Sequence, residues 1–131
     1  MATTGPACRL APCPRTPNCV STEAPAGSSR RMDPIPYTGS LDEARARLLR
    51  VLRDYPRTRI VSDPGLEPHY LKAECRSAFF RFVDEVEFVF DEGAKLIRFR
   101  SASRLGFRDF GVNRKRIEEI RAAFADAGGH P

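Results

Sequence analysis

The chain has 131 residues, which is enough for one domain with a modest core and too few for two. Its composition, 41% hydrophobic and 30% charged, is typical of a soluble globular protein. No apolar run approaches the roughly 20 residues that a membrane-spanning helix needs, and residues 1–11 lack the apolar core of a signal peptide. We therefore predict a soluble protein that has no membrane span and remains in the cytoplasm.

The formal net charge is +5, and arginine supplies most of the positive charge because only three of the basic residues are lysines. Arginine binds phosphate and carboxylate groups bidentately, so the bias is consistent with anion recognition. Codon usage in a GC-rich genome explains the bias as well, and we favour that explanation. Nucleic-acid binding is not expected, because the aromatic segment 79–88 also carries Asp84, Glu85 and Glu87, which would repel phosphate.

The first 36 residues differ from the rest of the chain, because seven of the eleven prolines fall there. Proline removes a backbone donor and blocks helices, so we predict an extended arm over residues 1–36 that lies over the core. Residues 37–131 are predicted to form a single α+β domain.

Two helices are predicted within that domain. The first begins after Ser40, which forms a capping box with Glu43, and ends before Pro56. The second runs from Asn113, a suitable N-cap, to Ala127. Apolar residues recur at helical spacing in both segments.

Four strand-like segments separate the helices, at residues 58–62, 69–77, 82–90 and 96–103. Alternation places Val86, Phe88 and Phe90 on one face together with Asp84. A hairpin loop is predicted over residues 91–94. Short connections favour a four-stranded, mainly antiparallel sheet with both helices on one face, which is a two-layer α+β sandwich with a Pro-rich N-terminal arm.

The segment from Arg100 to Arg114 is the strongest candidate for a binding site, because it is a polar turn between the last strand and the last helix. One hypothesis is an anion pocket at the helix N-terminus, with Arg104 and Arg114 as clamps. The alternative is that Asp109 pairs with one of these arginines and fixes the turn. The candidate ligand-binding residues, which include two from the preceding strands, are Glu74, Arg76, Arg100, Ser101, Ser103, Arg104, Asp109, Asn113 and Arg114.

The sheet face opposite the helices is predicted to be highly charged, with Glu74, Arg76, Glu85, Glu87, Arg98 and Arg100. Opposite charges on neighbouring strands stabilise each other by roughly 0.2–1 kcal/mol per pair. The face is therefore either a solvated set of ion pairs or a surface that receives the arm, a ligand or a second subunit.

The cysteines allow several interpretations. Cys8, Cys13 and Cys19 lie in the arm, but three thiols at these spacings are weak zinc candidates, since a structural site takes four ligands at paired spacings. A disulfide between Cys13 and Cys19 is a second interpretation, and a set of free thiols is a third. Cys75 is predicted to be a small core residue. No cofactor is predicted.

Evidence for catalysis is limited, because the sequence contains no recognisable catalytic motif. Cys75 with His69 as base is conceivable, and Asp84 and Glu74 are further candidate groups. A hydrolase or transferase of unknown type is therefore kept as an alternative function.

Five ordered motifs resemble an uncharacterised protein family, and they run in register from about Cys13 to Arg121. They are Cys13-Pro-x-x-Pro-Asn-Cys-Val-Ser21, Pro34-Ile-Pro-Tyr37, Tyr70-Leu-x-Ala-Glu-x-Arg-Ser77, Phe82-Val-Asp-x-Val-Glu-Phe88, and Arg100-Ser-Ala-Ser-Arg-x-Gly106 with Asp109-x-Gly-Val-Asn-Arg114. The family is known as domain of unknown function 1499. The resemblance implies no established activity and no catalytic residue. It also implies bacterial or plastid relatives that are often exported or tethered to membranes, so an exported or periplasmic location is the alternative to the cytoplasm.

The leading functional hypothesis is a non-enzymatic module that binds a small anion or a protein partner. Beside the hydrolase or transferase, a third hypothesis is an accessory subunit of a larger complex.

Overall fold

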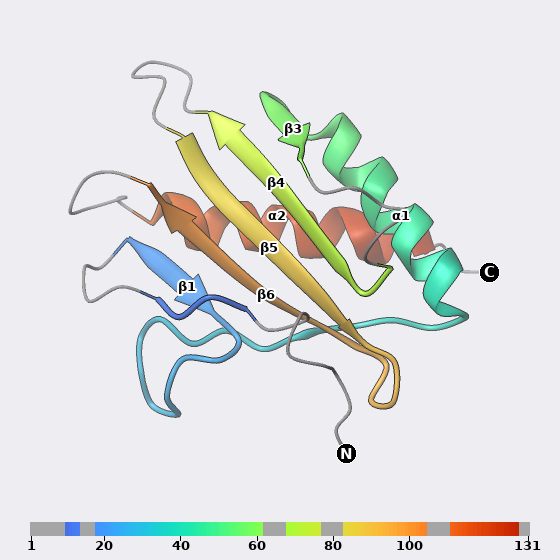
Figure 1. Cartoon of the computed structure of the whole chain (residues 1–131), viewed down its shortest axis with the longest axis horizontal. Coiled ribbons are helices and arrows are strands. Elements are labelled where there is room, and N and C mark those ends of the chain that lie inside the picture. The colour runs from blue at the N-terminus through green and yellow to red at the C-terminus, as the bar shows by residue number, and fades with distance from the viewer. Residues whose placement is uncertain (1–9, 14–17, 62–67, 77–82, 105–110, 129–131) are drawn as a thin grey trace.

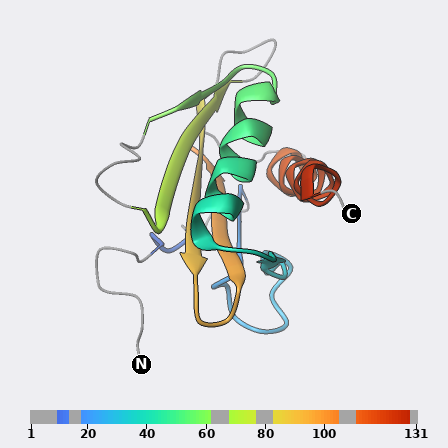
Figure 2. The same cartoon turned by 90° about the vertical axis from the view of Figure 1, so that its right-hand side faces the viewer.

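The computed structural model describes residues 10–13, 18–61, 68–76, 83–104 and 111–128. Its elements, in chain order, are β1 (Cys19–Ser21), β2 (Ile35–Pro36), α1 (Leu41–Asp54), β3 (Thr58–Ile60), β4 (Tyr70–Arg76), β5 (Val83–Asp91), β6 (Leu96–Ser103) and α2 (Val112–Gly128). The strands form one twisted sheet (Figure 1), and both helices lie on the same side of it (Figure 2). The predicted α+β class and the helices on one face are confirmed.

The first helix forms as its sequence predicts. The Ser40 hydroxyl accepts a hydrogen bond from the Glu43 amide at 3.1 Å, and the Glu43 carboxylate accepts one from the Ser40 amide at 2.9 Å. These two bonds satisfy backbone donors that a helix N-terminus otherwise leaves open. The helix ends at Asp54, two residues before Pro56.

The sheet is antiparallel and has the order β1-β6-β5-β4-β3, with β2 also paired to β6. The predicted count of four strands is wrong, since the described residues form six. The two additional strands, β1 and β2, lie in the predicted arm. Cys19 is opposite Ala102 and Ile35 is opposite Ile97, so both short strands pair with β6.

The hydrophobic core lies between the sheet and the two helices. Alternation along the strands turns Leu71, Val86, Phe88 and Phe99 toward the helices, and each of them is fully buried. The core is completed by fully buried helix residues, which include Leu48, Leu52, Ile117 and Ile120. We call this side of the sheet the inner face and the opposite side the outer face.

The second helix begins at Val112, so the prediction that Asn113 is its N-cap is wrong. Asn113 lies in the first turn of the helix and is completely buried. Its carboxamide is directed to residues of the inner face, with which it forms hydrogen bonds. Gly111, which has a φ of +79°, precedes the helix.

We expect Ser40→Ala to lower the free energy of unfolding by about 1 kcal/mol, because the substitution removes the side-chain acceptor of the capping box. Urea denaturation would measure the change. Thr38→Ala is the matched control, since this exposed hydroxyl lies outside the capping box and its removal should leave stability unchanged. An equal loss of stability in both variants would contradict the role of the cap.

Candidate functional site

The sheet divides the predicted site residues between its two faces. Ser101 pairs with Val86 and Val20, which are core residues, whereas Arg100 pairs with Glu87 and Ser21. Successive residues of a strand point to opposite faces. The structure therefore places Ser101, Ser103 and Asn113 on the inner side, and Glu74, Arg76, Arg100 and Arg104 on the outer side. Asp109 and Cys8 lie outside the described residues.

Arg114, the second predicted clamp, is separated from Arg104. Its guanidinium donates a hydrogen bond to the Ser29 carbonyl at 2.6 Å. Arg104 instead binds carboxylates on the outer face. The two arginines therefore do not converge on one anion site between the last strand and α2.

Asn113 is the centre of a buried hydrogen-bond network on the inner face. Its Oδ1 accepts from the Ser101 hydroxyl and from Arg116 Nη1, both at 2.7 Å. Its Nδ2 donates to the Ser103 hydroxyl and to the Asn18 carbonyl, both at 3.1 Å. The residue therefore ties α2 to β6 and to the segment before β1.

An ion pair lies next to this amide. Arg116 Nη2 is 2.6 Å from Asp84 Oδ2, and the two side chains are only 6% and 8% exposed. Arg116 Nη1 also donates to the Ser101 hydroxyl at 3.2 Å. Buried charges require such pairing, because the loss of hydration is large. We call these residues, together with Asn113 and Ser103, the inner network.

Sequence reasoning missed Arg116 and Asn18. The sequence did contain a signal for a buried cation such as Arg116, since Asp84 shares its strand face with Val86, Phe88 and Phe90. A carboxylate on an apolar face needs a buried cation. The contribution of Asn18 is a backbone carbonyl, which no residue type specifies.

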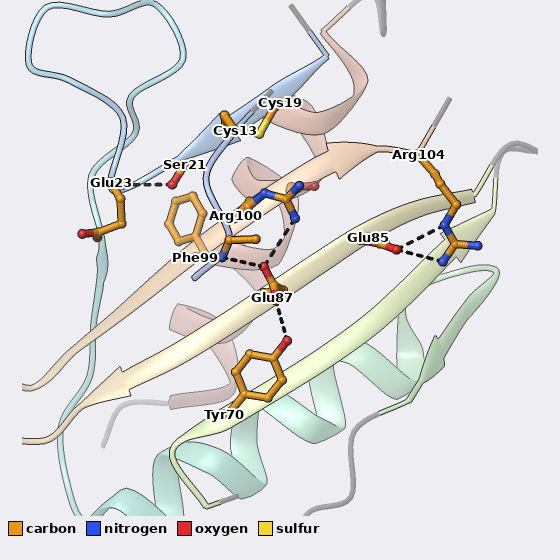
Figure 3. A network of polar contacts seen from close by, with 12 residues as sticks. Cys13, Cys19, Ser21, Glu23, Tyr70, Glu85, Glu87, Phe99, Arg100 and Arg104 are labelled. Carbon is orange, nitrogen blue, oxygen red and sulfur yellow. Dashed lines mark hydrogen bonds and ion pairs between the residues drawn. A yellow bond between two sulfur atoms is a disulfide. The ribbon is translucent and has the colours of Figure 1, made fainter. Parts of the chain in front are cut away.

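On the outer face, Glu87 receives hydrogen bonds from three parts of the chain. The Tyr70 hydroxyl donates to Oε2 at 2.5 Å, and Arg100 Nη1 and the Ala11 amide each lie 3.4 Å from Oε1. Glu87 is 8% exposed although both α1 and α2 lie on the other side of the sheet. Figure 3 shows Glu87 between Arg100 and Tyr70. Burial and the hydrogen bond to Glu87 raise the pKa of Tyr70, so this phenol stays protonated at neutral pH.

A second group of charges lies further along the outer face. Arg104 Nη2 is 2.9 Å from Glu74 and 3.0 Å from Glu85, and Arg59 is 2.9 Å from Glu74. Hydrogen bonds from Arg104 and Arg59 lower the pKa of Glu74, and those to Glu74 and Glu85 raise the pKa of Arg104. Arg76 is exposed beside this group. The Arg104–Glu85 pair is visible in Figure 3.

A disulfide between Cys13 and Cys19 joins residues 10–13 to β1. It lies close to Arg100, whose strand neighbour Ser21 belongs to β1 (Figure 3). A cleft of about 450 Å³ lies beside the disulfide and is lined by residues 10–13, by Ser21 and by Glu23, Ala24, Pro25, Ser28 and Arg30. Within the described residues, no cluster of three or more His, Cys, Asp or Glu side chains is arranged to hold a metal.

The residues considered for catalysis are not brought together. Cys75 is buried, and this burial raises the pKa of its thiol. His69 pairs with Glu92 and is six residues away from Cys75, which corresponds to about 20 Å along a strand. Asp84 faces Cys75 across β4 and β5 but is paired with Arg116, whereas Glu74 lies on the other face.

Among the described residues, neither helix has the length and apolarity to cross a bilayer.

We expect Arg116→Met to lower the free energy of unfolding by about 3–5 kcal/mol, because it leaves Asp84 buried without its partner. Adding Asp84→Leu should restore a large part of this loss, since no unpaired charge then remains. Arg114→Met is the matched control and should change stability by no more than about 0.5 kcal/mol. Urea denaturation would measure all four proteins. A double variant no more stable than Arg116→Met would contradict this account.

We expect Cys13→Ser to release residues 10–13 from the outer face and to lower global stability by at most about 2 kcal/mol, because the disulfide closes a short loop. Hydrogen exchange measured by NMR should accelerate at the Ala11 amide, which donates to Glu87. The Phe90 amide, which donates to the His69 carbonyl at 2.8 Å, serves as the internal control. Unchanged exchange at Ala11 would show that the disulfide does not hold this segment.

The chain was compared with protein families, curated proteins and solved structures. A family model described as "Protein of unknown function (DUF1499)" matches residues 9–124. No curated protein and no solved structure matches the chain. Since the family model covers nearly the whole chain, the protein belongs to the DUF1499 family.

Proposed function

We propose that this protein is a non-enzymatic binding module that docks a protein partner on the outer face of its sheet. The observation that carries the proposal is the contact between this face and residues 10–13 of the chain itself. The Ala11 amide donates to Glu87, so the face already accepts the backbone of a non-helical segment. Beside it, Arg100 also contacts Glu87, with its Nη1 3.4 Å from Oε1.

The protonation states of the outer face favour recognition over catalysis. General acids and bases are most effective when their pKa lies near the operating pH. The pKa of Glu74 instead lies further from neutral pH than usual, because hydrogen bonds from Arg104 and Arg59 lower it. The pKa of Arg104 is raised by its hydrogen bonds to Glu74 and Glu85, so this pair of groups also keeps its charges near neutral pH.

The arrangement of these charges favours a specific protein surface as the partner. An isolated exposed ion pair contributes only about 0–1 kcal/mol to stability, so the exposed pairs on this face add little to the fold. Ordered charges of both signs instead fix the register of a complex and reject surfaces with the wrong pattern. An accessory subunit of a larger assembly would use the same face.

Site-specific photocrosslinking in the native host tests this proposal. We expect a photoreactive benzoylphenylalanine at Arg76, on the outer face, to give a discrete adduct with a partner protein. The same group at Glu118, an exposed position on α2, is the control and should give no adduct. Arg104→Glu should reduce the adduct formed from position 76 severalfold, because it places a third acid between Glu74 and Glu85. Absence of an adduct at position 76, or equal adducts at both positions, would contradict the proposal.

A further inference from the structure

A strip of the outer face is buried although both helices lie on the other side of the sheet. Arg98, Arg100 and Arg104 share this face of β6, and their side chains are 41%, 12% and 44% exposed. Ala102, between the last two, is 3% exposed although it faces away from the helices. Glu87, opposite Arg100 on β5, is buried as well. We call Glu87, Arg100 and Ala102 the covered strip.

The disulfide between Cys13 and Cys19 lies at one end of the covered strip. Cys19 is opposite Ala102 in the sheet and is only 1% exposed. Figure 3 shows the disulfide next to Arg100. Cys13 is the more accessible half of the disulfide, because it is partly exposed and lines the cleft of about 450 Å³. A reductant therefore reaches the disulfide from the side of Cys13.

A covalent link and a weak one hold residues 10–13 on the covered strip. The disulfide is the covalent link. The weak one is the hydrogen bond from the Ala11 amide to Glu87 Oε1, which at 3.4 Å is longer than most N–H···O bonds. A tether keeps two surfaces at a high effective concentration, so the disulfide maintains a contact that would otherwise open readily. Cleavage of the disulfide therefore exposes the strip to competition from another chain.

We propose that the disulfide is a redox latch on the docking face, a regulation that rests on the proposed function. A dithiol reductant opens the latch, and residues 10–13 leave the covered strip. A thiolate of the reductant attacks Cys13 Sγ, the bond to Cys19 breaks, and Cys19 leaves as a thiolate that takes up a proton. The second thiol of the reductant attacks the mixed disulfide and releases Cys13 as a thiol. The reductant is oxidised to its disulfide, and the protein gains two electrons and two protons.

The occupant of the opened strip is an extended segment of the partner protein. Residues 10–12, Leu-Ala-Pro, are non-helical and place a backbone amide on Glu87, so they show which kind of segment the strip accepts. The partner segment supplies an equivalent amide in place of that of Ala11. Small or apolar side chains suit it, because Glu87 and Arg100 already pair with each other and Ala102 offers only a methyl group.

Solvent access to alanine methyl groups, measured by NMR, tests the opening without any partner. A neutral gadolinium chelate should relax the Ala102 methyl weakly in the oxidised protein. Dithiothreitol should raise this relaxation severalfold, because residues 10–13 no longer cover the methyl. The Ala73 methyl, which is fully buried on the inner face, is the internal control and should not respond. Cys13→Ser/Cys19→Ser should match the reduced protein without any reductant.

Photocrosslinking in the native host tests the regulation itself. Benzoylphenylalanine at Lys72, opposite Glu87 on β4, should give a partner adduct severalfold stronger in Cys13→Ser/Cys19→Ser than in the disulfide-bonded parent. The same group at Arg76, at the end of β4, is the reference for docking and should give similar adducts in both backgrounds.

The latch is overturned if the Ala102 methyl responds equally before and after reduction, or if the adduct from position 72 is the same in both backgrounds. An adduct from position 76 that persists in these cases leaves the docking function intact. Absence of the adduct from position 76 in both backgrounds contradicts docking and, with it, the regulatory role of the disulfide. The opening of the strip is still measured at Ala102 in that case, so the two failures are distinguishable.

Discussion

The ion pair between Arg116 and Asp84 is the interaction on which the arrangement of the inner face depends. A buried ion loses its hydration, so it requires an opposite charge at short range and further hydrogen bonds. Arg116 meets both requirements through Asp84 and through the oxygens of Ser101 and Asn113. Asn113 extends the network to Asn18. The polar groups thus fix α2 against β5, β6 and the start of β1, where apolar packing alone would allow small displacements.

The strand pleat explains why residues from one sequence motif serve different purposes. Ser101 and Ser103 alternate with Arg100 and Arg104, so the first pair joins the inner network and the second reaches the outer face. The serines hold the fold together. The arginines instead form ion pairs with Glu87, Glu74 and Glu85 on the outer face. A linear motif of this kind supplies hydrogen bonds to the inner network and charges to the outer face at the same time.

Long elements with clear periodicity could be predicted from the sequence. Helix α1 and strands β4, β5 and β6 lie within two residues of their expected limits, because alternation and capping signals extend over many positions. Strands β1 and β2 are too short to show a measurable alternation, and the prolines around them suggested coil. Their pairing depends on hydrogen bonds from β6, which only the tertiary structure supplies. The contacts of Asn113 likewise depend on side chains that are distant in sequence.

Sequence proximity was a poor guide to which polar side chains lie together in the fold, and the distribution of arginines shows why. Arginines on neighbouring strands come close to carboxylates through the antiparallel register, as Arg100 and Glu87 do. Other arginines come together where elements without such a register meet. Arg47 and Arg121 lie on different helices and come together with Tyr37 only through helix packing. A linear motif cannot reveal this combination, because it depends on residues that are distant in the sequence.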